Sequence, residues 1–185
     1  MTATLEALAA LLAAEAALDN WDVAPSVGLL TRRGEDFELV RFEMSEQFWS
    51  MSDPVTLVGV LAVAVNHPDR PSWVTIPARI PEGYTLDGVA LFTESWGLDL
   101  AGMSSGEKAI AEALAESRGV ANHPNRIEMK MIGAVDSAGG RYMIQYRRGD
   151  DAPHEAAEDH EGVALTGRLF DALIALLAAL KQSGL

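Results

Sequence analysis

Apolar residues recur at helical spacing near both ends of the chain. Residues 4–19 place leucines among many alanines, and residues 163–181 repeat leucine and phenylalanine at intervals of three and four positions. Such spacing puts the apolar side chains on one broad face of a helix, and alanine and leucine are strong helix formers. The sequence therefore predicts long N-terminal and C-terminal helices.

Alternating apolar and polar residues predict two β-hairpins and one further strand. Residues 26–32 and 37–44 flank a turn-like Arg-Gly-Glu-Asp, and residues 127–133 and 141–147 flank Asp-Ser-Ala-Gly-Gly. Side chains of a strand point alternately to its two faces, so alternation around a glycine-containing turn is typical of a hairpin. Residues 86–96 are predicted to form a strand that is buried on both sides.

Two capping signals predict internal helices. Asp53-Pro54 precedes the apolar run 55–65, and aspartate is a preferred N-cap while proline suits the first helical position. The β-branched residues of this run would also suit a strand, but its cap and its length favour a helix. Ser104 and Glu107 have the spacing of a capping box. We therefore interpret Ser104, within Gly-Met-Ser-Ser-Gly, as a helix cap rather than a nucleophile.

The order of these elements predicts an α+β protein. Hairpins with intervening helices favour a largely antiparallel sheet of five or six strands packed with helices, rather than a doubly wound parallel sheet. The proline-rich stretch 68–81 is expected to be a loop or an edge strand, and the acidic segment 149–161 is expected to be mobile. At 185 residues, the chain 1–185 is expected to be one domain.

A net charge of −13 restricts the partners of the protein. A surface this acidic repels nucleic-acid phosphates and anionic lipids, so direct nucleic-acid binding is disfavoured. The same charge attracts a basic protein partner, although solubility alone also explains it. The start of the chain has no basic leader, and no apolar run is long enough for a bilayer. We therefore expect no membrane contact and a cytoplasmic location.

Two similar segments supply the material for a metal site. Asn66-His67-Pro68-Asp69-Arg70 and Asn122-His123-Pro124-Asn125-Arg126 each follow a predicted helix and precede a predicted strand. They are either a decayed duplication or two similar helix-ending turns. If the turns meet at one end of the sheet, His67, Asp69 and His123 supply two imidazoles and a carboxylate, with positions left for water and substrate. The resulting hypothesis is a metal-dependent hydrolase.

Charged residues on the predicted strands suggest two further sites. Glu94, Asp99 and Glu128 are candidates for paired carboxylates in acid–base chemistry, although the chain has many acids. Basic residues gather on the final hairpin, where Lys130 and Arg148 lie near Glu128. Cross-strand ion pairing is the expected reason, and a small anion site is the alternative.

The remaining features favour binding over catalysis. The chain has no cysteine and no phosphate-binding glycine loop of the common kinds, so no cofactor is expected. Trp73, Phe92 and Trp96 either fill the core or line a pocket between sheet and helix. The favoured function is a non-catalytic binding or accessory protein that acts through protein–protein contacts, and the hydrolase is the alternative. The apolar terminal helices also suit a homodimer, or burial within one chain.

Overall fold

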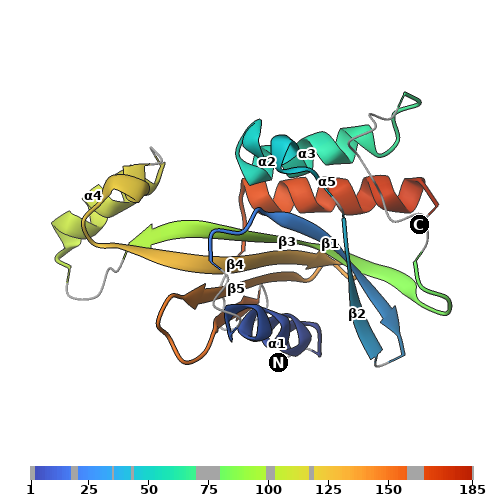
Figure 1. The fold of residues 1–185 in the computed structure, drawn as a ribbon, viewed down its shortest axis with the longest axis horizontal. Helices are drawn as coiled ribbons and strands as arrows, with labels where there is room; N and C mark the ends of the chain where they lie inside the picture. Colours follow the sequence, from blue (N-terminus) through green and yellow to red (C-terminus); the bar gives the residue numbers. More distant parts are fainter. Residues whose placement is uncertain are drawn as a thin grey trace.

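An antiparallel sheet runs through the length of the protein and separates two groups of helices (Figure 1). The computed structural model describes residues 3–17, 21–34, 36–42, 44–69, 80–98, 103–116, 119–157 and 165–184. The strand order is β2-β1-β3-β4-β5-β6, and every neighbouring pair is antiparallel. The α+β class and the antiparallel sheet are thus confirmed. The strands are β1 (Ser26–Arg33), β2 (Asp36–Arg41), β3 (Thr85–Leu98), β4 (Arg126–Asp136), β5 (Arg141–Arg147) and the short β6 (His154–Ala157).

The helices cover both faces of this sheet. Helix α1 (Ala3–Ala17) packs on β4 and β5 from one side, while α5 (Arg168–Gln182) packs on β3 and β4 from the other. Helix α3 (Pro54–Ala64) lies on α5, next to the short α2 (Glu46–Ser50). Helix α4 (Ser105–Glu116) and the 3-10 helix η1 (Gly119–Asn122) stand at one end of the long strands (Figure 1).

The core on the α5 side is the larger of the two. Leucines at positions 173, 176 and 180 of α5 are all fully buried, as the three-and-four spacing predicts. They meet the side chains that alternate inward from the central strands, among them Val89 and Leu91 of β3. Helix α3 adds Leu57, Val58 and Leu61 from above.

The core on the α1 side uses the other residues of the same strands. Leu5, Leu8 and Leu12 of α1 pack against Phe92 of β3 and Ile132 of β4, and all five are at most 5% exposed. Because successive residues of a strand face opposite sides, Leu91 and Phe92 enter different cores. The sheet is therefore a layer between two apolar clusters.

Local hydrogen bonds set the start of α3, the start of α4 and the turn between β4 and β5, as predicted. The Asp53 carboxylate accepts the Thr56 N–H at 3.1 Å, which caps α3 as predicted. In the capping box of α4, Glu107 accepts the Ser104 N–H at 2.7 Å. The turn of the β4–β5 hairpin is held by the Asp136 carboxylate, which accepts the N–H groups of Ala138 and Gly140.

Three segments differ from the prediction or lie outside the described residues. Helix α5 begins at Arg168 rather than at 163, because Gly167 takes a φ of 108° and interrupts the helical path. In the acidic segment 149–161, residues 154–157 form the edge strand β6, which pairs with β5. The proline-rich stretch is described only up to residue 69 and again from residue 80. None of the described helices is both long and apolar enough to cross a membrane.

Candidate binding pocket

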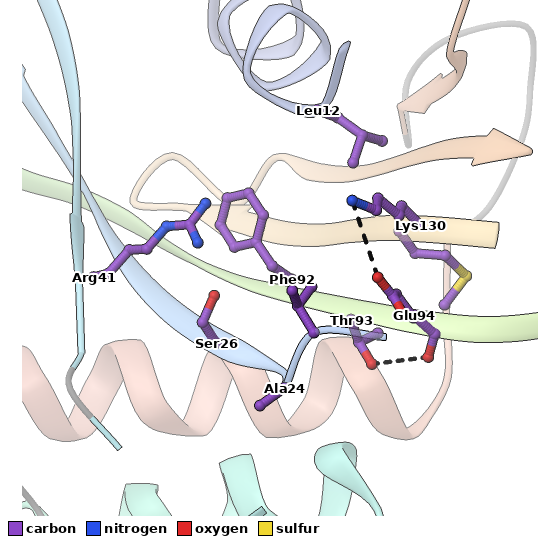
Figure 2. Close-up of a pocket in the computed structure, with 10 residues that line it drawn as sticks. Leu12, Ala24, Ser26, Arg41, Phe92, Thr93, Glu94 and Lys130 are labelled. Atoms are coloured by element: carbon purple, nitrogen blue, oxygen red, sulfur yellow. Dashed lines mark hydrogen bonds and ion pairs between the residues drawn. The ribbon is translucent and has the colours of Figure 1, made fainter. Parts of the chain in front are cut away.

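A cavity of about 230 Å³ lies beside α1, next to the part of β3 that extends past the start of β1. Its wall is formed by Leu12 of α1, by Val23 and Ala24, by Ser26 of β1, and by residues of β2, β3 and β4. Phe92, Glu94 and Lys130 come from the sheet face that carries α1, and Thr93 and Met131 from the opposite face. Figure 2 shows Phe92 in the middle, with Arg41 on one side and Glu94 with Lys130 on the other. An apolar wall with charged groups at its two ends is a typical composition for a small-molecule site.

Arg41 forms the positive end of the cavity. It is the last residue of β2, and its guanidinium carbon lies 4.8 Å from the centre of the Phe92 ring. Desolvation by burial lowers the pKa of Arg41 from its ordinary value. An anion bound beside this guanidinium would offset that desolvation and would accept from a planar fork of N–H donors.

Glu94 and Lys130 form the other end of the cavity. They are directly opposite one another on β3 and β4, and Lys130 Nζ lies 4.0 Å from Glu94 Oε1. Lys130 is only 2% exposed. Glu94 Oε2 accepts the Asp22 N–H at 2.7 Å, whereas Glu94 Oε1 is buried and accepts no hydrogen bond from the described residues. A buried carboxylate oxygen without a hydrogen bond is energetically unfavourable, so a donor from a bound ligand would stabilise Glu94 Oε1.

Two more carboxylates lie close to Glu94. Asp22, Glu94 and Glu128 each bring an oxygen within 4.8 Å of the others. Arg148 pairs with Glu128 at 2.6 Å, as the sequence predicted for the final hairpin. Among the described residues, these three carboxylates meet two cations, Lys130 and Arg148, so the negative charges outnumber the positive ones. Asp22 is held here with a φ of 67°, a left-handed conformation that aspartate tolerates better than most residues.

Trp21 covers this charged cluster. Its ring centre lies 5.0 Å from Lys130 Nζ and 5.1 Å from the guanidinium carbon of Arg148. Both distances are within the range of a cation–π contact. Because the two cations already balance most of the carboxylate charge, we interpret the cluster as an ion network beside the cavity and not as a metal centre.

The structure does not bring the predicted metal ligands together. His67 follows α3 and His123 precedes β4, and these two ends lie at opposite ends of the molecule's long axis (Figure 1). Each histidine instead accepts a backbone hydrogen bond through Nδ1, from Asp69 N–H at 3.2 Å and from Asn125 N–H at 3.1 Å. Among the described residues, no cluster of three metal-ligating side chains includes either histidine. Two similar turns are sufficient to explain the repeated motif.

The predicted aromatic pocket is present only in part. Phe92 lines the cavity, but Trp96 is 41% exposed and lies under Arg126, whose guanidinium carbon is 4.8 Å from its ring. Trp73 lies outside the described residues. Phe92 and Trp96 share one face of β3, yet the Trp96 side chain is beyond the cavity because the two residues are four positions apart along the strand.

Ser104 has a structural role. The segment Gly-Met-Ser-Ser-Gly has the spacing of a nucleophile elbow, but the Ser104 hydroxyl donates to Glu107 at 2.6 Å at the start of α4. Hydrogen bonds from Ser104 lower the pKa of Glu107. The hydroxyl is thus committed to a helix cap, as predicted.

Part of the site was predicted from the sequence. Glu94 and Glu128 were candidates for paired carboxylates and Lys130 was a candidate for ion pairing on the hairpin, and the three side chains do lie close together. Asp99, the third candidate, lies outside the described residues. Arg41 and Trp21 were missed. Neither has a local signal for the site, because Arg41 is a charged residue at the end of β2 and Trp21 lies outside the strands.

Comparisons of this chain with models of protein families, with curated proteins and with solved structures found no significant match. Its function is therefore inferred from the chemistry of the cavity and of the surface alone.

Proposed function

We propose that this protein is a non-catalytic binding protein that holds a small zwitterionic molecule in the cavity beside α1. The observation that supports the proposal is the opposite charge at the two ends of one cavity, Arg41 at one and the carboxylate cluster around Glu94 at the other. A molecule with a carboxylate and an ammonium group complements both ends, whereas a simple anion or cation complements only one.

The positive end suits a carboxylate. A guanidinium presents its N–H donors in a fixed plane, a geometry that matches the two oxygens of a carboxylate. The stacking of this guanidinium on Phe92 fixes the plane of the donors. Ser26, at the start of β1, adds a hydroxyl to the same cavity wall.

The negative end suits an ammonium group. Glu94 Oε1 accepts no hydrogen bond from the described residues, and Lys130 Nζ is 4.0 Å from it. Asp22 and Glu128 add negative charge close by. A ligand ammonium would supply the missing donor and would balance the excess charge of the cluster.

The size of the cavity limits the ligand. About 230 Å³ is below the roughly 300–1,000 Å³ of pockets that take drug-sized ligands. Leu12 and Phe92 supply an apolar wall between the charged ends. A molecule of amino-acid size with a short apolar body therefore fits better than a nucleotide or a lipid.

A binding role is favoured over catalysis. The described residues that line the cavity include a serine, an arginine, a glutamate and a lysine, but no histidine that could act as a base for the serine. The metal-dependent hydrolase loses its support because His67 and His123 lie apart and each caps its own turn.

Isothermal titration calorimetry tests the proposal. Neutral amino acids are ranked first, and the tightest one is compared with the amine that lacks its carboxylate and with the acid that lacks its ammonium group. We expect the zwitterion to bind at least about tenfold more tightly than either truncated compound, since each has lost one charged anchor. Equal binding of the acid and the zwitterion would contradict the role of Glu94. Absence of binding by every amino acid would contradict the proposal as a whole.

Matched variants locate the binding site. Arg41→Met and Glu94→Gln should each abolish most of the calorimetric signal while the protein stays folded. Arg126→Met is the control, because Arg126 also stacks on an aromatic ring at 4.8 Å but lies outside the cavity. An equal loss of binding in the control variant would show that the ligand binds elsewhere.

A further inference from the structure

Helix α3 is apolar on all sides, yet one side of it faces outward. Its sequence, Pro-Val-Thr-Leu-Val-Gly-Val-Leu-Ala-Val-Ala, contains no charged residue. Leu57, Val58 and Leu61 are buried against the core, whereas Val63 on the other side is 74% exposed and Val60 is 39% exposed. A surface helix of a monomer normally has a polar outer face, and a contiguous exposed apolar face indicates an interaction site.

The side chains on the outer side of α3 and of the turn after it form one continuous face, in which Thr56 is half-buried and the others are exposed. Thr56, Val60, Val63 and His67 recur at intervals of four, three and four residues, the spacing of a seam between paired helices. A groove of about 500 Å³ follows these residues and Gly59. We call this surface the α3 face.

We infer that the α3 face binds the α3 face of a second copy of this chain, with the two helices antiparallel across a two-fold axis. Two-fold dimers with self-complementary surfaces are the commonest assemblies of soluble proteins. A net charge of −13 opposes self-association over most of the surface. The helical part of the α3 face carries no charge, so it can meet its own copy without bringing like charges together.

The charges at the two ends of the α3 face are complementary. At the first end, Arg168 donates to the Thr56 hydroxyl at 2.9 Å and lies 3.8 Å from Asp53, and its side chain is 68% exposed. At the other end is the exposed Asp69, after the turn that follows α3. An antiparallel arrangement places Arg168 of each copy beside the partner's Asp69, twice in one dimer.

The middle of the α3 face permits a close approach of the helices. Gly59 lies there, and a Cβ built at this position meets no atom within 4 Å. Two helix backbones can therefore approach at this point, with Val60 and Val63 of each copy packed around the crossing.

Sedimentation velocity of the full chain tests this inference. The mass expected for wild type at micromolar concentration is twice the 19.8 kDa of one chain. Val63→Asp should give the single-chain mass, because it places a carboxylate at the centre of the interface. Ile110→Asp is the control, since Ile110 of α4 is 63% exposed and lies far from α3. A single-chain mass for wild type would overturn the inference and would leave the α3 face to a different protein partner.

A charge exchange tests the antiparallel arrangement. Arg168→Glu and Asp69→Lys should each weaken dimerisation about tenfold or more, because each places like charges together. The double variant should recover most of the wild-type dimer. Dimers unaffected by the single variants, or no recovery in the double variant, would overturn the antiparallel pairing. Circular dichroism at the same concentrations shows whether each variant stays folded.

Discussion

The sheet face that packs against α5 is apolar where it meets that helix. The face that packs against α1 changes from apolar to charged between two successive residues on the same side of β3. On the α5 side, Val89 and Leu91 of β3 pack against fully buried leucines. On the α1 side, Phe92 is the last apolar residue that β3 contributes to the core, and the next residue on that face is Glu94. The same strand thus supports a dry core on one face and an ion network beside a cavity on the other.

The apolar α5 side contributes mainly to stability, whereas the α1 side also contains the candidate site. Burying Lys130 and Glu94 costs desolvation free energy that an apolar pair of similar volume would avoid. We therefore interpret the charged residues on the α1 side as a feature kept for ligand binding.

The largest expected effect comes from the α5 side. Leu173→Ala should lower the free energy of unfolding by about 2–5 kcal/mol, because it leaves a cavity in a fully buried core. Urea denaturation measures the change, and calorimetry should show unchanged ligand binding by the folded protein. The adjacent Ile174 is 43% exposed, so Ile174→Ala should change stability by roughly 0.5 kcal/mol or less. Equal effects of the two variants would contradict the assignment of this core.

A smaller effect is expected on the α1 side. Lys130→Met should lower the free energy of unfolding by about 1–3 kcal/mol, because it removes the cation nearest to the buried Glu94 Oε1. The double variant Lys130→Met/Glu94→Gln should recover part of this loss in urea denaturation. If the double variant is the less stable one, packing of the lysine stem rather than charge balance explains the position.

The smallest effect is expected at α4, which lies on neither face of the sheet. Hydrogen bonds from Ser104 lower the pKa of Glu107 below its ordinary value of 4.5. The ionised carboxylate therefore stabilises the start of α4 at pH above about 4.5, and this contribution is lost as the pH falls through the lowered pKa. The hydrogen-exchange protection of the α4 amides, relative to the intrinsic exchange rate at each pH, should fall in that range. Glu107→Gln should remove the pH dependence, and its persistence would contradict the capping role.

Much of the fold could be predicted because its signals are local. The Asp53 cap, the Ser104–Glu107 capping box and the Asp136 turn each depend on residues within four positions of one another. The start of α5 could not be predicted. Apolar residues keep their helical spacing on both sides of Gly167, whereas the backbone of Gly167 is not helical. The spacing of apolar residues indicates which face of a helix a residue occupies. It does not indicate at which residue the helix begins or ends.

The candidate site could be predicted only in its parts. Register places Glu94 opposite Lys130, and the hairpin pattern already suggested that acids and bases of these strands would pair. Arg41 and Trp21 join them from distant segments, and nothing in their own neighbourhood indicates this. The repeated histidine motif suggested a shared metal site, but the two similar segments form similar turns at separate places.

By itself, the sequence determined the elements, their caps and the two apolar sets of side chains that alternate along the strands. These depend on backbone geometry, which repeats every two residues in a strand and about every 3.6 in a helix. The tertiary structure alone decided which charged residues share a cavity and which side of α3 stays uncovered. Both depend on where strands and helices that are distant in sequence come to rest, and no local pattern encodes those positions.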